Sequence, residues 1–108
     1  MVTYADRVLD ALGDPTRRTV LKRLRAGPRS VGDIANGMDV SRPAVSQHLR
    51  VLKAAHLVTD RAEGSRRLYA VDTRGINAVR DWLDGFWDDA LTAFKRAAER
   101  EAIKERKP

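Results

Sequence analysis

The stretch from residue 41 to residue 58, SRPAVSQHLRVLKAAHLV, constrains the fold more than any other part of the sequence. Ser41 is a favourable N-cap for a helix, and the proline two residues later is tolerated in a first helical turn. Val45, Leu49 and Leu52 recur at a spacing that places them on one stripe of that helix. The stretch therefore predicts a helix that packs one face on a core and leaves the other face exposed.

A shorter helix is predicted just before this one. Ser30 and Asp33 form a capping pattern at its start. Residues 37–40 then form a tight connection to the next cap at Ser41. Two short helices joined by about four residues predict a helix-turn-helix.

The outward face of the predicted helix carries residue types that read DNA. Arg can bond guanine O6 and N7, Gln can bond adenine N6 and N7, and small apolar groups can contact a thymine methyl. Residues 41–59 contain no Asp or Glu, whereas a solvated helix face usually mixes Glu with Lys. This absence of acid favours a DNA-contacting face over an ordinary solvated one. The outward residues near the start of the helix are Arg42, Pro43, Ala44, Ser46, Gln47 and Arg50.

The rest of the chain is predicted to contain three further helices and a hairpin. Helices are expected over residues 3–13 and 14–27 and from residue 72 or 73 to about Ala98, with strands over 57–62 and 66–71. Gly64 lies in the turn between the strands, where it can adopt a positive φ. The expected fold is mainly α with a small β-hairpin (α+β), in the order α-α-α-α-β-β-α.

A chain of 108 residues is expected to form one domain. Residues 1–98 are predicted to be the DNA-binding and dimerisation domain, and residues 99–108 a charged, frayed C-terminal tail. There is no cysteine, so the chain can form neither a disulfide nor a thiolate metal site. The N-terminal MVTYADRV does not read as a signal peptide, and no apolar run approaches 18 residues, so we expect a cytoplasmic protein without a membrane partner.

Charge is unevenly distributed along the chain. The net charge is +6 and the pI is about 10.3, a balance that suggests an acidic partner, most often nucleic acid. Residues 42–67 hold six basic residues against two acidic ones, whereas residues 72–94 hold five Asp against two Arg. On charge alone, an ordinary solvated surface remains an equal alternative.

The predicted hairpin, VTDRAEGSRRLYAV, adds Arg61, Arg66 and Arg67 around its turn. A basic hairpin behind a helix-turn-helix can follow the phosphate backbone or enter the minor groove. By alternation Arg67 shares a strand face with Tyr69, whose ring is expected to pack inward. Arg66 is therefore the better candidate for contacting DNA.

Nearly the whole chain, from Tyr4 to about Phe94, resembles the ArsR/SmtB family of bacterial winged-helix repressors. The resemblance lies in LGDPTRRTVLKRL, in DIANGMDVSRPAVSQHLRVLKAAHLV and in EGSRRLYAV. It implies a winged helix-turn-helix that binds an imperfect inverted repeat in double-stranded DNA as a homodimer. It also implies repression, usually including the repressor's own operon.

The resemblance also implies roles for individual residues. Many members have Gln where this chain has Arg42, which would shift base preference toward guanine. By position, the expected base-contacting residues are Arg42, Pro43, Ser46 and Gln47. The expected backbone-contacting residues are Ser41, Arg50, Lys53, Ser65 and Arg66.

The metal switch of that family is missing from the sequence. The stretch that holds Cys-x-Cys in thiolate sensors reads RSVGDIANGM here, and the last helix has Asp but no His. His48 and His56 are the only histidines, and eight residues of helix would separate them by about 12 Å. We therefore expect no metal and no cofactor, and the chain resembles the metal-independent branch, whose inducers are often unknown.

The last predicted helix carries an apolar face that spans about half of its circumference, wider than one-sided packing needs. A chain of this size would leave much of that face uncovered. We expect a two-fold dimer in which this helix and the first pack against their copies, although a wide core-facing helix or an effector-binding patch are alternatives. The predicted interface residues are Leu9, Leu12, Trp82, Phe86, Trp87, Leu91 and Phe94.

The leading functional hypothesis is a sequence-specific, autoregulating transcriptional repressor. One alternative is a nonspecific DNA-architectural protein, which would have no need of base-reading residues such as Gln47. Another is a dimeric interaction module that has lost operator binding. An enzyme is not expected, because the sequence has no Cys nucleophile, no phosphate-binding glycine loop and no His-centred acid–base cluster.

Overall fold

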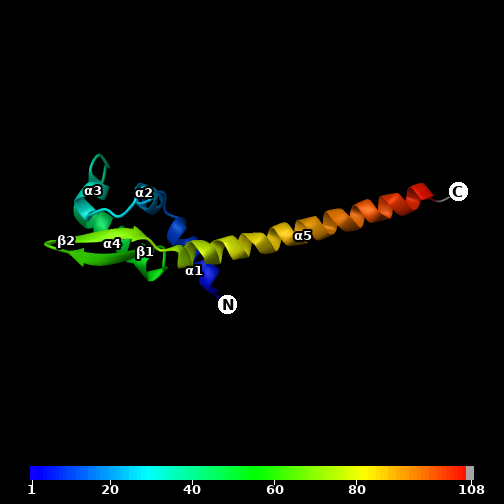
Figure 1. The fold of residues 1–108 in the computed structure, drawn as a ribbon, viewed down its shortest axis with the longest axis horizontal. Helices are drawn as coiled ribbons and strands as arrows, with labels where there is room; N and C mark the ends of the chain where they lie inside the picture. The colour runs from blue at the N-terminus through cyan, green and yellow to red at the C-terminus, as the bar shows by residue number, and fades with distance from the viewer. Residues whose placement is uncertain (107–108) are drawn as a thin grey trace.

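The computed structural model describes residues 1–106 as a small body of short helices and a hairpin, from which one long helix projects (Figure 1). The predicted order of elements, and with it the mainly α fold with a small hairpin, is confirmed. Residues 107 and 108 of the predicted tail lie outside the described residues. The elements are α1 (Tyr4–Leu12), α2 (Pro15–Arg23), α3 (Val31–Ala35), α4 (Arg42–Ala54), β1 (Val58–Glu63), β2 (Arg66–Val71) and α5 (Thr73–Arg106).

The core lies between the first four helices and the hairpin. α4 runs through its centre, because the predicted stripe of Val45, Leu49 and Leu52 is fully buried. Other elements supply the apolar side chains around this stripe. These are Val8, Ala11, Val20, Leu24, Ile34, Ala55, Leu57 and Val58.

The DPTRR segment forms a hydrogen-bonded elbow between α1 and α2. The carboxylate of Asp14 caps α2 by accepting hydrogen bonds from two backbone N–H groups of its first turn. Arg17 Nε donates to the Ala11 carbonyl at 2.6 Å, and Arg18 Nη1 donates to the Leu12 carbonyl at 2.7 Å. These carbonyls end α1 and have no partner within that helix, so the two arginines satisfy them and hold the two helices together.

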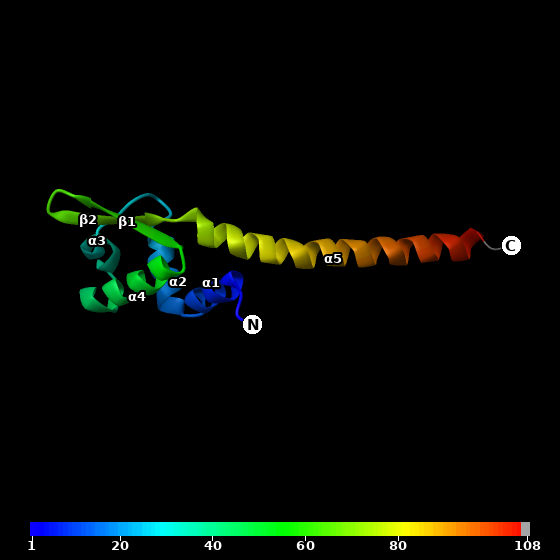
Figure 2. The ribbon, with the colours of Figure 1, turned by 90° about the horizontal axis from the view of Figure 1, so that it is seen from below.

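The hairpin is an antiparallel pair whose register runs from Val58 opposite Val71 to Glu63 opposite Arg66. Gly64 has φ 62° in the turn, as the sequence predicts. Figure 2 shows the hairpin lying along one side of α3 and α4. Tyr69 is half-buried and exchanges two backbone hydrogen bonds, of 2.9 and 2.8 Å, with Arg29. These bonds fix the hairpin to the loop that precedes α3.

His56 joins the end of α4 to both α1 and α5. It has φ 57°, a left-handed conformation that is unfavourable for a residue with a Cβ. Its carbonyl accepts a hydrogen bond from the Gly75 N–H at 2.8 Å, and its Nδ1 lies 3.0 Å from the Tyr4 hydroxyl. These contacts with α5 and α1 hold the residue in this conformation.

Several predicted boundaries were wrong. The last helix continues past Ala98 to Arg106, because Ala, Glu, Arg and Lys are strong helix formers even where charge is dense. α2 ends at Arg23, before Gly27, since turn-type bonds already begin at the next residue. β1 starts at Val58 because the Leu57 N–H is bonded to a carbonyl of α4. The fraying of the tail stays a prediction.

Candidate nucleic-acid interface

The start of α4 brings the four predicted base-contacting residues together. Arg42, Pro43 and Gln47 are exposed and Ser46 is half-buried. By helical position Pro43 and Gln47 lie opposite the buried stripe, whereas Arg42 and Ser46 lie on one flank of it. The hydroxyl of Ser41 caps the helix by accepting a hydrogen bond from the backbone N–H three residues later, at 3.2 Å. Because the stripe anchors the helix, these side chains are held in fixed positions on a part of α4 that carries no acidic residue.

Arg42 lies back across α3. A Cβ added to Gly32 would lie 3.1 Å from the Arg42 Cζ atom, so the guanidinium packs directly on this glycine. The neighbouring Arg66 of β2 has its Nη1 3.9 Å from a carboxylate oxygen of Asp33, and both side chains are more than half exposed. Together with Arg67 these side chains line a groove of about 710 Å³ between α3 and the hairpin.

Gln47 and Arg50 contact each other on the exposed face. Arg50 Nη1 donates to Gln47 Oε1 at 3.1 Å. This bond orients the side-chain amide of Gln47 and leaves its NH₂ group pointing away from Arg50. Arg50 is therefore placed both to support a base-reading side chain and to meet a phosphate.

The hairpin turn exposes Ser65 and Arg66, the two predicted wing contacts. Arg61 Nη2 lies 3.4 Å from Glu63 Oε2, again with both side chains more than half exposed. Exposed pairs of this kind are weak and exchange readily with other ions. The tip of the hairpin therefore offers cations that are available to a nearby polyanion.

Asp60 on β1 organises a different kind of contact, which the sequence analysis missed. Its side chain is only 11% exposed, and its two carboxylate oxygens lie 2.8 Å from Lys53 Nζ and 3.1 Å from Arg67 Nη1. The hydrogen bond from Lys53 is the main cause that lowers the pKa of Asp60, and Arg67 lowers it further. Alternation from the buried Val58 puts Asp60 on the inward face of β1, and an acid at such a position is the signal that could have revealed it.

The two histidines have separate environments. His56 contacts the ring of Tyr4, with ring centroids 5.7 Å apart, and His48 is half-buried on α4. In the part of the chain that the structure describes, no three His, Cys, Asp or Glu side chains come together as metal ligands would.

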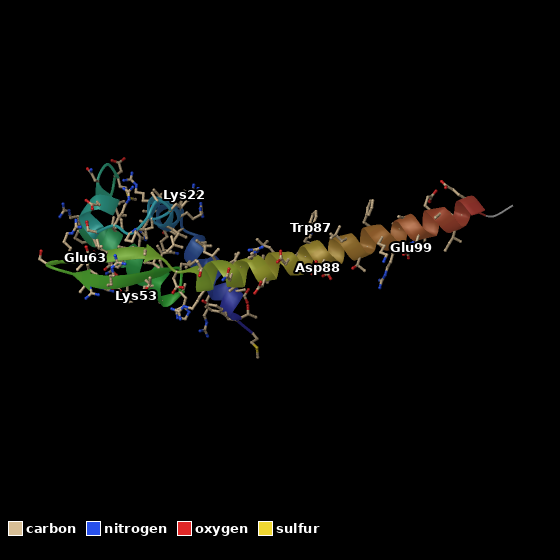
Figure 3. All side chains as sticks on the ribbon, viewed as in Figure 1. Lys22, Lys53, Glu63, Trp87, Asp88 and Glu99 are labelled. Atoms are coloured by element: carbon tan, nitrogen blue, oxygen red, sulfur yellow. The ribbon has the colours of Figure 1, made fainter. Side chains whose placement is uncertain are left out.

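The apolar face of α5 is uncovered. Every described side chain from Asp81 onward is exposed, and the chain is 78 Å long but only 29 and 22 Å across. Trp87 is 65% exposed and Phe94 74%, while the predicted partners on α1, Leu9 and Leu12, are half-buried. Figure 3 shows Trp87 and Asp88 on opposite edges of the projecting helix. Despite this apolar face, no helix within residues 1–106 has the length and hydropathy that a bilayer span requires.

Comparison with known proteins reveals close relatives of the chain. Residues 12–61 match a family described as a helix-turn-helix domain. The chain is 50% identical over 103 residues to the HTH-type transcriptional regulator Rv2034 of Mycobacterium tuberculosis, covering 94% of this chain and 96% of that protein. It is 35% identical over 81 residues to the transcriptional repressor SdpR of Bacillus subtilis, covering 75% of this chain and 90% of that protein.

A solved structure resembles the fold as well. It is the homodimeric winged helix-turn-helix DNA-binding domain of Mb0332 from Mycobacterium bovis, described as a possible ArsR-family transcriptional regulator. The TM-score is 0.62 at 27% sequence identity, and the alignment covers 97% of this chain and 86% of that one.

Proposed function

The chain belongs to the ArsR/SmtB family of winged helix-turn-helix transcriptional regulators, and from this premise we propose that it represses transcription by binding an operator as a homodimer. The observation that carries the proposal is the acid-free, exposed start of α4, held in place by the buried Val45, Leu49 and Leu52. The operator is an imperfect inverted repeat, and the regulated genes include the repressor's own.

α4 enters the major groove with its N-terminal half. Arg42 bonds guanine O6 and N7, Gln47 donates its amide to a base acceptor, and Pro43 and Ser46 contact neighbouring base edges. The backbone contacts of Ser41 and Arg50 set the register of the helix. From the hairpin, Ser65 and Arg66 meet the phosphates beside the minor groove. Lys53 is a further predicted backbone contact, and in the free protein its ammonium is paired with Asp60.

The dimer forms through α5 and α1 of each copy. The exposed aromatic face, including Trp82, Phe86 and Trp87, is larger than a monomer of this size normally leaves in water. In a two-fold dimer each copy covers the face of the other. Two α4 helices about 34–36 Å apart would then read successive major grooves.

Regulation of this repressor is independent of thiolate-bound metal, because the chain has no cysteine. The effector, where one acts, must bind the DNA-competent and incompetent dimers unequally.

The test compares two duplexes at one salt concentration. One duplex is recovered by repeated selection of genomic fragments on the protein, and the other is a mixed-sequence duplex of equal length. A repressor binds the selected duplex about 10³-fold or more tightly. Equal affinities would instead support a nonspecific architectural protein, and absence of binding to either would support an interaction module.

Variants then assign the contacts. Arg42→Ala and Gln47→Ala are expected to weaken binding to the selected duplex most. Each should also reduce discrimination against the wrong base at one position, by about 1–3 kcal/mol. Arg66→Ala should weaken binding to both duplexes alike, since Arg66 contacts phosphate. If all three variants bind like the wild-type protein, this face is not the DNA-binding surface.

A further inference from the structure

We propose that Asp60 is a specificity-determining residue, which withholds Lys53 and Arg67 from the DNA phosphates and so limits nonspecific binding. The inference rests on the proposed function, because it concerns the same surface. The role of this acidic residue, which lies on a mainly basic face, is to reduce the attraction of DNA and not to increase it.

The geometry makes Asp60 a shared counter-ion. One carboxylate oxygen lies 2.8 Å from Lys53 Nζ on α4, and the other lies 3.1 Å from Arg67 Nη1 on β2. The three residues therefore connect α4, the recognition helix of the proposed function, to both strands of the hairpin. The carboxylate itself is almost completely covered, with 11% of the side chain exposed.

The other acids on this surface are arranged differently. Glu63 pairs with Arg61 at 3.4 Å and Asp33 pairs with Arg66 at 3.9 Å, and in both pairs every side chain is more than half exposed. Arg61 and Arg66 can exchange such partners for phosphate at little cost, since water solvates the acid that is left behind. Figure 3 labels Glu63 near the tip of the hairpin and Lys53 on the recognition helix.

Release of Lys53 or Arg67 has a larger cost. Removing partners from a carboxylate that is mostly covered leaves a poorly solvated charge behind, which is unfavourable. Both cations therefore stay on Asp60 when DNA approaches. The cations left for phosphate on α4 and the hairpin are those of Arg50, Arg61 and Arg66, while Arg42 contacts a base.

This arrangement affects nonspecific binding more than operator binding. Nonspecific affinity comes almost entirely from the number of phosphates that the protein neutralises. Operator affinity adds base contacts, which Asp60 does not reduce. Withholding two cations therefore raises the ratio of operator to nonspecific affinity, and the same contacts fix the hairpin against α4.

The first experiment compares Asp60→Asn with Glu63→Gln. Both variants remove one negative charge from β1, but only the first removes a mostly covered carboxylate that holds two cations. Affinity for a 30-base-pair mixed-sequence duplex is measured by fluorescence anisotropy over a range of salt concentrations. For Asp60→Asn we expect the slope of log affinity against log salt to steepen by up to about 1.8, because about 0.9 is added per phosphate neutralised. For Glu63→Gln we expect less than half of that change.

A second experiment does not depend on the folding of the Asp60 variant. Lys53→Gln in the otherwise unchanged protein should alter the slope by less than a third of the change caused by Arg50→Gln. A Lys53→Gln effect equal to that of Arg50→Gln would show Lys53 on phosphate and would overturn the proposal. In the Asp60→Asn background, Lys53→Gln should become as effective as Arg50→Gln.

The third measurement concerns discrimination. On the duplex recovered by genomic selection, Asp60→Asn should gain less affinity than on mixed-sequence DNA, so the ratio of the two affinities falls threefold or more. An unchanged ratio and slope in Asp60→Asn, with a wild-type protein that still discriminates, overturns this inference alone. A wild-type protein that does not discriminate overturns the proposed function, while the salt slopes still report on Asp60.

Discussion

Replacing Trp87 by alanine tests the dimer most directly. Trp87 is 65% exposed in the single chain and lies on the uncovered apolar face of α5. Alanine preserves the helix, because it has the highest helix propensity, and removes only the indole. The variant therefore separates loss of the interface from loss of the helix.

The size of the effect follows from the area of the ring. A tryptophan buries up to about 250 Å², so its exposed part exceeds that of an alanine at the same site by about 100 Å². At about 25 cal/mol per Å² this is about 2.5 kcal/mol for each protomer. Two-fold symmetry doubles the loss to about 5 kcal/mol per dimer, which weakens association by three to four orders of magnitude, at about 1.4 kcal/mol per tenfold.

Sedimentation velocity over a wide range of protein concentrations measures this change. The matched control is Asp88→Ala, which removes a side chain from the opposite edge of the same helix turn and should leave the dimer intact. Operator binding by Trp87→Ala should weaken in parallel, because the two recognition helices are no longer linked. If Trp87→Ala dimerises within tenfold of the wild-type affinity, the apolar face is not the interface and the area argument is refuted.

Further predictions concern the stability of the fold, and urea unfolding measures each of them. Gly75→Ala should destabilise by about 1–3 kcal/mol, because its Cβ would lie 2.8 Å from the His56 carbonyl oxygen. Gly85→Ala should stabilise α5 by up to about 1 kcal/mol, since nothing lies within 4 Å of its added Cβ; equal effects at the two glycines would contradict the packing. Ser41→Ala should cost about 1 kcal/mol through loss of the α4 cap, and an unchanged midpoint would argue against that cap. Because the pKa of Asp60 is lowered in the folded protein, its contribution is fully present above the ordinary value of 3.8 and is lost as pH falls through the lower folded pKa. Asp60→Asn should therefore flatten the acid side of the stability profile below about pH 4, and an unaltered profile would count against the paired carboxylate.

Local signals in the sequence predicted much of the fold. Caps at Ser30 and Ser41 and the turn at Gly64 depend on residues within a few positions of one another, and all three appear as predicted. The stripe on α4 was also predictable, because helical periodicity alone puts its members on one face. The end of α5 could not be predicted in this way, because its dense charge suggested fraying whereas its residue types favour helix.

The candidate site was predictable as a surface but not as a network of contacts. Exposure of Pro43 and Gln47 follows from the burial of the stripe on the opposite side of α4. The pairing of Lys53 with Asp60 depends on how closely the hairpin approaches α4, which no pattern along the chain encodes. The same is true of the contact between His56 and Tyr4, which joins residues 52 positions apart in the sequence. The roles of these residues toward DNA remain predictions.

Hydrogen bonds between helices connect the proposed dimer interface to the proposed DNA-binding helix. Arg17 ties α1 to α2 through the carbonyls that end α1, and His56 ties the end of α4 to α5 through Gly75 and to α1 through Tyr4. The recognition helix is therefore held to both helices of the proposed interface by short hydrogen bonds and not by a flexible linker. It follows that the spacing of two α4 helices in a dimer is set by how the α5 helices pair. A shift of that pairing by one helical turn, about 5.4 Å, would misplace both recognition helices against successive major grooves without any change in α4 itself.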